Sequence, residues 1–263
     1  MMEARHQKIL TLLGQRGSLP GSEIARIFGV TPMTAWRDMK TISELGLAMR
    51  VRGGLRKKDG LPGEPVFEQR RPHGRDVKTR IACKAVSSYI REGMVLAMEG
   101  GTTVEATIPY LPEKRISIIT NSLPVAIRLR EERPQLPVQV VGGWLSPVSG
   151  NLTGANALRE TSRLRADICF ISASGFDTRV GPSDPNPLEI EVKRALVEIS
   201  RQTILLLESR KFGLLDAAVT LHPRRLHGLV SEVAPPEKIA SFCRGHTIRI
   251  TVASLGDAPQ EDA

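Results

Sequence analysis

Small polar residues follow several apolar runs in the later part of the sequence, and groups of this kind can bind anions. A Gly-Gly-Thr-Thr loop at 100–103 comes directly after the apolar run 95–98. Where such a loop opens a helix, its backbone N–H groups, its hydroxyls and the helix dipole can hold a phosphate. Lys211, which follows the apolar run 204–207, could neutralise that phosphate. The pattern therefore predicts a site for a phosphate-bearing ligand.

Further polar loops follow the apolar runs 116–119 and 168–171 at the equivalent position. If the runs are strands of an open parallel sheet, these loops share its carboxyl edge, which is where ligands bind in such sheets. The residues expected to contact the ligand are Gly100, Gly101, Thr102, Thr103, Thr120, Asn121, Ser122, Gly175, Asp177, Lys193 and Lys211.

Asp177, Glu191 and Lys193 could instead transfer a proton at a carbon next to a carbonyl group, which requires them to lie within reach of the substrate. Glu191 and Lys193 are two residues apart on a predicted helix, so they cannot both face one pocket squarely. Lys193 is then either a ligand contact or a surface lysine. The five histidines show no catalytic or metal-binding spacing. We expect no catalytic residue, no metal and no cofactor.

A different group of side chains, within the first sixty residues, suits contact with double-stranded DNA. At 100° per residue along a helix over 32–45, Ala35, Met39 and Ile42 share one side and Arg37 lies opposite them. Guanidinium and hydroxyl groups can read base edges in the major groove, and cations can bind phosphates. The residues expected to contact DNA are Thr31, Met33, Thr34, Arg37, Lys40, Thr41, Arg50, Arg52, Arg56 and Lys57.

Helix signals position these DNA-contacting residues. A first helix is predicted over 4–16, followed by a second helix that Ser22 caps and Gly29 ends. Thr31 can cap a third helix, with Pro32 at its first position, where the missing N–H group matters least. Two short helices joined by a tight turn that contains glycine are typical of a helix-turn-helix.

A basic hairpin is predicted after the third helix, which Gly46 ends. Every second residue of 47–51 is a large apolar one, and the pair Gly53-Gly54 then forms a turn into a second basic strand. Such a wing supplies phosphate contacts or reaches into a minor groove. Its cations are Arg50, Arg52, Arg56, Lys57 and Lys58.

The net charge is concentrated in this same part of the chain. The 263 residues carry a formal charge of +9, and residues 1–80 hold 16 Lys and Arg against 8 Asp and Glu. A basic segment joined to an almost neutral body suggests a head that binds a polyanion on a body with another task. The alternative is a basic tail that is simply solvated.

Proline and glycine mark the boundary between the two parts. They are frequent in 59–75, which is an unlikely helix or central strand and is predicted to be a linker. It separates a winged helix-turn-helix at 1–58 from a domain at 76–253, and 254–263 is predicted to be a flexible tail. In the second domain, continuous apolar strands alternate with helices, which predicts a mainly parallel sheet covered on both faces. The alternating segment 247–252 could add an edge strand.

Several classes of protein are excluded by composition. The three cysteines lie far apart without a CxxC motif, which argues against a disulfide framework and a structural zinc site. No apolar run approaches the ~18–20 residues that a membrane span needs, and the N-terminus does not have the pattern of a signal peptide. We expect a soluble protein in the cytoplasm, without a membrane partner.

The head carries three motifs in order: Arg5-x3-Ile9, Val30-Thr31-x2-Thr34-Ala35-Trp36-Arg37-Asp38-Met39 and Leu47-x2-Arg50-x2-Gly53-Gly54. They resemble the N-terminal signature of the DeoR family of bacterial transcriptional regulators. The family usually has a basic residue where this chain has Trp36. We expect Trp36 to cover the seam between the helices, and the alternative is that it stacks on a sugar or a thymine methyl group.

The second domain resembles the C-terminal sensor domain of the same family. The resemblance is carried by Lys78-Thr79-Arg80-Ile81-Ala82, Gly100-Gly101-Thr102-Thr103, Thr120-Asn121-Ser122, Gly142-Gly143, Gly154, Gly175-x-Asp177, Glu191-x-Lys193-Arg194-Ala195 and Lys211-Phe212-Gly213. The family usually has Asp where this chain has Glu208, and Asp or Ser where it has Glu99, so both acids are longer here. The resemblance implies binding of a phosphorylated sugar or a similar intermediate.

Together the two resemblances imply an α/β protein in which a winged helix-turn-helix precedes a sensor domain with the fold of ribose-5-phosphate isomerase. The implied function is that of a DNA-binding regulator, a repressor, whose affinity for its operator depends on a phosphorylated metabolite. Heads of this kind act in pairs on repeated half-sites, which predicts a homodimer or a tetramer. The alternatives are an isomerase-like enzyme with an appended basic domain and an RNA-binding adaptor, although the head lacks the aromatic surface typical of RNA binding.

Overall fold

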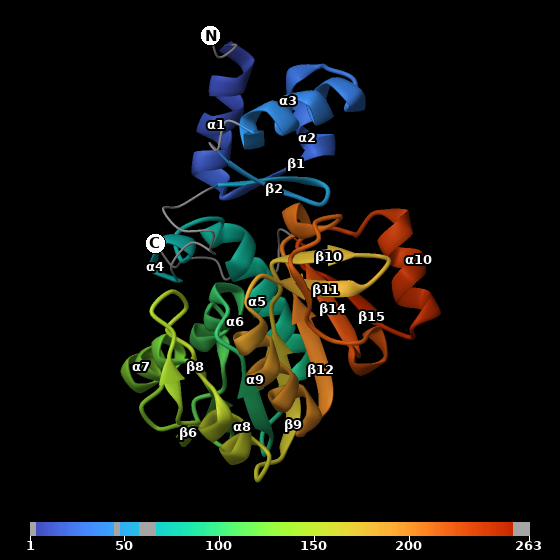
Figure 1. The fold of residues 1–263 in the computed structure, drawn as a ribbon. Helices are drawn as coiled ribbons and strands as arrows, with labels where there is room; N and C mark the ends of the chain where they lie inside the picture. The colour runs from blue at the N-terminus through green and yellow to red at the C-terminus, as the bar shows by residue number, and fades with distance from the viewer. Residues whose placement is uncertain (1–3, 45–47, 58–66, 255–263) are drawn as a thin grey trace, which may run out of the picture.

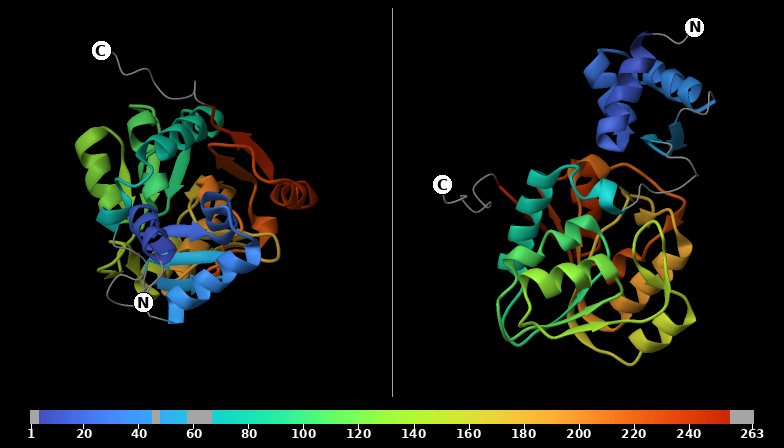
Figure 2. Two further views of the ribbon diagram at one scale, coloured as in Figure 1. Left: turned by 90° about the horizontal axis from the view of Figure 1, so that it is seen from above. Right: turned by 90° about the vertical axis from the view of Figure 1, so that its left-hand side faces the viewer.

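The computed structural model describes residues 4–44, 48–57 and 67–254, which form an N-terminal head above a larger body (Figure 1). We use "head" for residues 4–57 and "body" for residues 67–254 within these ranges. In Figure 1 and in the right-hand view of Figure 2, the strands of the head face the body and its helix α3 lies on the outer side.

The head has the predicted helices and hairpin. Its elements are α1 (Ala4–Arg16), β1 (Ser18–Pro20), α2 (Gly21–Phe28), α3 (Pro32–Glu44), β2 (Ala48–Val51) and β3 (Gly54–Lys57). Gly29 ends α2 in the left-handed conformation, and the Thr31 hydroxyl accepts a hydrogen bond from the Thr34 amide at 3.2 Å, both as predicted. The predicted end of α3 at Gly46 lies outside the described residues.

Two details of the head differ from the prediction. Ser22 does not cap α2, because the chain enters the helix directly from β1 and the helix begins at Gly21, two residues earlier than predicted. The strand β1 itself was not predicted, and it pairs with β3 to make a three-stranded sheet in the order β1-β3-β2. The wing hairpin, β2 and β3, is therefore part of a three-stranded sheet in which β3 is the middle strand.

An ion-pair cluster and an apolar core hold the head together. The Asp38 carboxylate on α3 accepts hydrogen bonds from Arg5 at 2.7 and 2.9 Å and contacts the His6 ring at 3.0 Å, so it ties α1 to α3. Burial acts to raise the pKa of Asp38, but the bonds from Arg5 and His6 outweigh it and hold the pKa below its ordinary value. The buried apolar side chains are Ile9, Leu13, Leu19, Ile24, Ala35, Met39, Ile42, Ala48 and Leu55.

The later part of the predicted linker is a structured segment that packs on the body. It includes the short helix α4 (Phe67–Arg70), and the Phe67 side chain is buried while its amide donates to the Val148 carbonyl at 2.8 Å. Arg71 forms an ion pair with the buried Glu105 of the body. The prediction that 59–75 is free of helix is therefore wrong at Phe67–Arg70, where one large apolar side chain and a neighbouring ion pair dock the segment on the body.

The body is built on a parallel sheet of seven strands in the order β15-β14-β12-β9-β4-β5-β6. The predicted strands are present, including the edge strand at the C-terminal end, whereas β14 was not predicted. In chain order the strands are β4 (Val95–Met98), β5 (Ser117–Thr120), β6 (Val138–Val140), β9 (Ala166–Ile171), β12 (Ser200–Leu206), β14 (Gly228–Ser231) and β15 (Arg249–Val252).

Helices cover both faces of this sheet, as the continuous apolar strands predict. Successive residues of one strand enter opposite cores: Leu96 packs with α5 (Arg75–Tyr89), α6 (Thr102–Glu105) and α7 (Leu123–Glu132), and Ala97 packs with α9 (Pro187–Glu198) and α10 (Glu237–Gly245). Helix α8 (Ala155–Thr161) packs beside α9. Within the described ranges, no helix is both long enough and apolar enough to span a membrane.

Smaller elements extend the carboxyl edge of the main sheet. A second sheet joins β10 (Gly175–Asp177), β11 (Gly181–Asp184) and β13 (Ala218–Val219), and it lies between the main sheet and the head (Figure 1). A hairpin pairs β7 (Trp144–Leu145) with β8 (Leu152–Thr153). Short 3-10 turns occur at η1 (Ile108–Tyr110), η2 (Ser209–Lys211) and η3 (Pro223–Arg225). The turn η2 meets β1 of the head.

Candidate functional site

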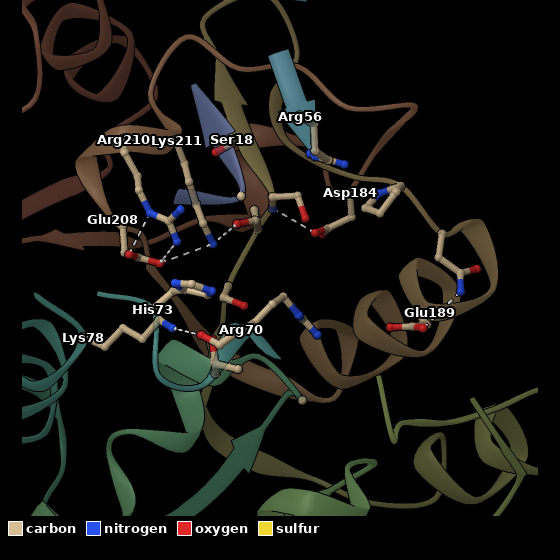
Figure 3. Close-up of a pocket in the computed structure, with 18 of the residues that line it drawn as sticks. Ser18, Arg56, Arg70, His73, Lys78, Asp184, Glu189, Glu208, Arg210 and Lys211 are labelled. Carbon is tan, nitrogen blue, oxygen red and sulfur yellow. Dashed lines mark hydrogen bonds and ion pairs between the residues drawn. The ribbon is translucent and has the colours of Figure 1, made fainter. Parts of the chain in front are cut away.

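A cavity of about 440 Å³ lies between the head and the carboxyl edge of the main sheet. Figure 3 shows Ser18 and Arg56 reaching it from the strands of the head, and Arg70, His73 and Lys78 reaching it from the opposite side. The lining is net positive, because it holds seven Lys and Arg but four Asp and Glu. These are Arg16, Arg56, Arg70, Lys78, Lys193, Arg210 and Lys211, with Glu99, Asp184, Glu189 and Glu208.

Lys193 is at the centre of a buried charge network on one wall of the cavity. Its Nζ donates to the Ser172 carbonyl at 2.8 Å and to Asp184 Oδ2 at 2.6 Å, and it lies 3.3 Å from Glu99 Oε1. The Lys193 side chain is buried, whereas Glu191 on the same helix is exposed. The structure thus places Lys193 in the cavity wall and not at the surface, and it separates Glu191 from the site.

The two glycines of the 100–103 loop allow polar side chains to approach closely. A Cβ atom on Gly100 would lie 1.7 Å from Asn151 Oδ1, and one on Gly101 would lie 1.9 Å from Ser172 Oγ. Asn151 is in turn held by Glu189, which accepts from its Nδ2 at 3.1 Å. Glycine is therefore needed here because other side chains occupy the space that a side chain would fill.

Several polar atoms near these loops are buried without a hydrogen-bond partner among the described residues. Buried polar groups normally have one, so such atoms call for a ligand or a water molecule. These atoms are Thr103 Oγ1, Asn121 Oδ1, Ser122 Oγ and Asn151 Oδ1. Of these four residues, Asn151 also lines the cavity. Thr120, by contrast, is satisfied, since its hydroxyl donates to the Met98 carbonyl at 2.8 Å.

Glu208 and its cations form a second charge cluster in the cavity wall (Figure 3). Arg210 donates to both carboxylate oxygens of Glu208, at 2.9 and 3.0 Å, and Lys211 lies 3.9 Å from it. Burial acts to raise the pKa of Glu208, but Arg210 and Lys211 hold it below its ordinary value. Burial, opposed in part by the Glu208 carboxylate, lowers the pKa of Lys78 to about 8. Burial likewise lowers the pKa of Lys211.

Some of the predicted ligand contacts lie in the cavity wall and others do not. Gly100, Thr102, Lys193 and Lys211 line it. The predicted contacts outside the lining are Gly101, Thr103, Thr120, Asn121, Ser122, Gly175 and Asp177. The Asp177 carboxylate instead accepts from Arg179 at 2.7 Å, and burial raises its pKa.

Sequence reasoning missed the part of the wall that the head and the short helix α4 supply. Arg16, Arg56 and Arg70 carried no local signal for this role, because the residues that they meet are distant in the sequence. Arg210, for example, donates a hydrogen bond to the carbonyl of Arg16, which is 194 positions away. Lys78 and Glu208 were noted in the sequence as part of the resemblance to the sensor domain, but they were not predicted to contact the ligand.

The outer side of α3 is exposed, as contact with DNA requires. Arg37, Lys40 and Thr41 are exposed, together with Met33 and Thr31, and Thr34 is half-buried. On the wing, the Arg50 and Arg52 side chains are exposed as well. The predicted DNA contact of Lys57 stays a prediction.

Arg56 is an exception, and the prediction that it contacts DNA is wrong for this structure. Its side chain is buried in an ion pair with Asp216 of the body, whose side chain is buried too. Leu55 lies in the core of the head, so the alternation of the strand turns Arg56 to the other face of the hairpin, against the body. We call this region the wing contact, formed by Arg52, Gly53 and Arg56 of the head with Gly213, Leu215 and Asp216 of the body.

Backbone groups complete the wing contact. The Leu215 amide donates to the Arg52 carbonyl at 3.1 Å. Gly53 has a φ of +97°, and a Cβ atom on it would lie 2.3 Å from the Gly213 carbonyl oxygen. The turn of the wing therefore lies directly against the loop that follows Lys211.

A winged helix-turn-helix joined through a ligand-sized cavity to an α/β domain defines a regulator that binds DNA and senses a small molecule. The sequence profile of the DeoR-like helix-turn-helix domain matches residues 5–59, and that of the DeoR C terminal sensor domain matches residues 74–232. The chain belongs to the DeoR family of transcriptional regulators.

Known relatives cover nearly the whole chain. The transcriptional repressor CsqR of Escherichia coli is 28% identical over 98% of this chain and 96% of that protein. The glycerol-3-phosphate regulon repressor of the same organism is 29% identical over 94% of this chain and 97% of that protein. Among solved structures, ribose 5-phosphate isomerase A of Methanocaldococcus jannaschii matches with 16% identity and a TM-score of 0.39, over 52% of this chain and 54% of that chain.

Proposed function

We propose that this chain is a transcriptional repressor whose affinity for its operator is controlled by a phosphorylated sugar, or a similar anionic metabolite, bound in the cavity between head and body. The observation that carries the proposal is the net positive lining, in which Lys78 and Lys211 have lowered pKa values because they are buried. An anion placed among these groups favours their charged forms. One of the relatives is named as the repressor of a glycerol-3-phosphate regulon, which is consistent with a phosphorylated effector.

A ligand in this cavity can reach the DNA-binding head directly. Arg16, Ser18 and Arg56 belong to the head and line the cavity, so a ligand that contacts them binds differently when the head is displaced. An effector shifts an equilibrium only by such a difference in affinity between two states. Through the wing contact the head docks on the body, and a bound ligand would favour or oppose this docked state.

The enzyme alternative is less well supported by the site. Lys193, its strongest candidate for proton transfer, already donates to Ser172 and Asp184 and lies beside Glu99. Asp177 does not line the cavity. We infer that the chain binds its ligand without converting it, and sugar phosphates recovered unchanged after long incubation would agree with this.

The repressor is expected to act as a homodimer or tetramer, because two heads are needed to read repeated half-sites. Its expected compartment is the cytoplasm, where bacterial operators lie. Analytical ultracentrifugation of the full chain, with and without operator DNA, measures its oligomeric state.

Ligand binding is testable by thermal unfolding of the full chain in the presence of phosphorylated sugars. A sugar phosphate at 100 times its dissociation constant should raise the free energy of unfolding by ~2.7 kcal/mol. The matched non-phosphorylated sugar should not, and Lys211→Gln should weaken the effect because Lys211 lies in the cavity wall. If the sugar and its phosphate raised stability equally, a phosphate site in this cavity would be contradicted.

The pH dependence of binding has a defined sign. As the pH rises through about 8, Lys78 loses its proton, so affinity for an anion should fall. Stability of the unliganded chain should respond to Lys78 in the opposite direction. Between about 8 and the ordinary pKa of 10.5 the folded state binds fewer protons at this group than the unfolded state does, so its contribution to stability rises with pH. Lys78→Met should remove the contribution of Lys78 to both trends and leave that of Lys211, whose pKa is also lowered.

Sequence-specific binding should depend on Arg37. We expect Arg37→Ala to weaken binding to the operator by ~1–3 kcal/mol, because an arginine that reads a base edge loses its bidentate contact. Lys57→Ala should weaken binding to operator and random DNA alike, as a phosphate contact does. Arg201→Ala, which removes an exposed arginine of the body, serves as the control. Gel-shift titrations measure the affinity of each variant for operator DNA and for random DNA. If Arg37→Ala weakened binding to both DNAs equally, a base contact by Arg37 would be refuted.

A further inference from the structure

The indole of Trp36 lies on the exposed side of α3. Its exposed fraction is 41%, and it does not belong to the apolar core of the head. Trp36 therefore does not pack into the core between the helices, and much of its ring remains available to a partner. A large aromatic side chain that stays in solvent on a DNA-facing surface gains free energy when a partner covers it.

Cations from two elements surround this ring. The Arg50 guanidinium carbon on β2 lies 4.5 Å from the ring centroid, and Lys40 Nζ, one turn further along α3, lies 5.8 Å from it. A cation over an indole face is attracted by the ring quadrupole. A basic side chain at position 36 would instead repel Arg50, so the indole draws the wing cation toward the recognition helix.

The neighbouring side chains make this surface partly apolar. Met33 is three residues before Trp36, on the same face of α3, and is 61% exposed. In the major groove, the C5-methyl group of thymine is the apolar feature of a base edge, and side chains of this type contact it. An apolar pair beside Arg37 is thus suited to an A·T pair.

We propose that Trp36 is a specificity-determining residue that reads a thymine methyl group in the major groove, and that its ring positions Arg50 for an adjacent phosphate. The proposal rests on DNA binding through α3. It gives this chain an operator preference that a basic residue at the same position would not produce.

Substitution of thymine by deoxyuridine tests the first part, because it removes the methyl group and keeps the base pairing. Operator duplexes are selected from a random pool by the full chain, and each thymine is then replaced in turn. The wild-type chain should lose affinity about three- to ten-fold at one thymine in each half-site, as expected for burying one methyl group. Trp36→Ala should show no loss at that thymine, and Trp36→Phe should keep part of it.

Two control variants make the outcome specific. Trp144→Ala removes the other tryptophan, which is 80% exposed on the body, and should leave the uracil profile unchanged. Arg37→Ala should weaken binding but keep the sensitivity to the thymine methyl, which shows that α3 is still the reading helix. The proposal is overturned if no thymine responds in the wild-type chain, or if Trp36→Ala retains the same loss.

A double-mutant cycle tests the positioning of Arg50. Arg50→Ala should weaken binding to all duplexes and lower the slope of log affinity against log salt by about one, as loss of a phosphate contact does. In the Trp36→Ala chain, where the ring no longer holds the guanidinium, the same change should have a smaller effect. Equal effects of Arg50→Ala in both chains would overturn the positioning role.

Discussion

Lys193→Met is expected to lower the free energy of unfolding by about 3–5 kcal/mol, because it leaves buried carboxylates without their cation. Glu99 and Asp184 are both buried or nearly so, and the Lys193 Nζ contacts both at 3.3 and 2.6 Å. Methionine has a similar length, so loss of packing is kept small. Urea denaturation followed by circular dichroism measures the change.

The assignment of this loss to charge has its own controls. Lys238→Met replaces an exposed lysine of α10 and should change stability by less than about 0.5 kcal/mol. Adding Glu99→Gln to Lys193→Met should recover part of the loss, since one of the two unpaired acids is then neutral. A Lys193→Met chain as stable as wild type would mean that Lys193 is not the counter-ion of these acids.

Asp216→Ala is expected to uncouple the effector from DNA binding. Allosteric coupling typically changes affinity by about 5- to 150-fold. In the Asp216→Ala variant, we expect the effector to leave operator affinity nearly unchanged. Without Asp216, Arg56 would remain buried without a partner if the head stayed docked, which costs several kcal/mol, so the head separates from the body. Operator affinity is measured with and without the sugar phosphate that raises the unfolding temperature.

An independent readout tests the docking itself. Small-angle X-ray scattering of the Asp216→Ala chain should show a larger radius of gyration than wild type. The charge-reversed pair Arg56→Asp with Asp216→Arg should recover both docking and coupling. Glu92→Gln breaks the exposed pair with Arg115 and should change neither property. Full coupling in Asp216→Ala would exclude the wing contact as the route of the signal.

The head and the main sheet could be predicted from sequence because their signals are local. Gly29 ends a helix through its own backbone conformation, and Thr31 caps the next helix through its own hydroxyl. The apolar runs of the body predict strands since each strand is buried on both faces. β14 escaped prediction because only two of its four residues, Leu229 and Val230, are large and apolar.

The composition of the cavity wall could not be predicted, because it depends on how the head docks. Arg56 looked like a DNA contact in a basic hairpin, and only its partner Asp216, 160 positions later, gives it another role. Phe67 similarly turns part of an apparent linker into a packed segment. Trp36 shows the reverse, since an apolar residue expected in a seam is exposed beside Arg50.

The two halves of this regulator are not interchangeable parts. Residues of α1, β1 and β3 form one side of the cavity that we propose as the ligand site, so they contribute to this cavity as well as to the DNA-binding domain. A chimera that joins this body to the head of a relative would keep its parallel sheet and yet replace one wall of its receptor. Under the proposed function, a change in the head also changes the cavity that selects the metabolite.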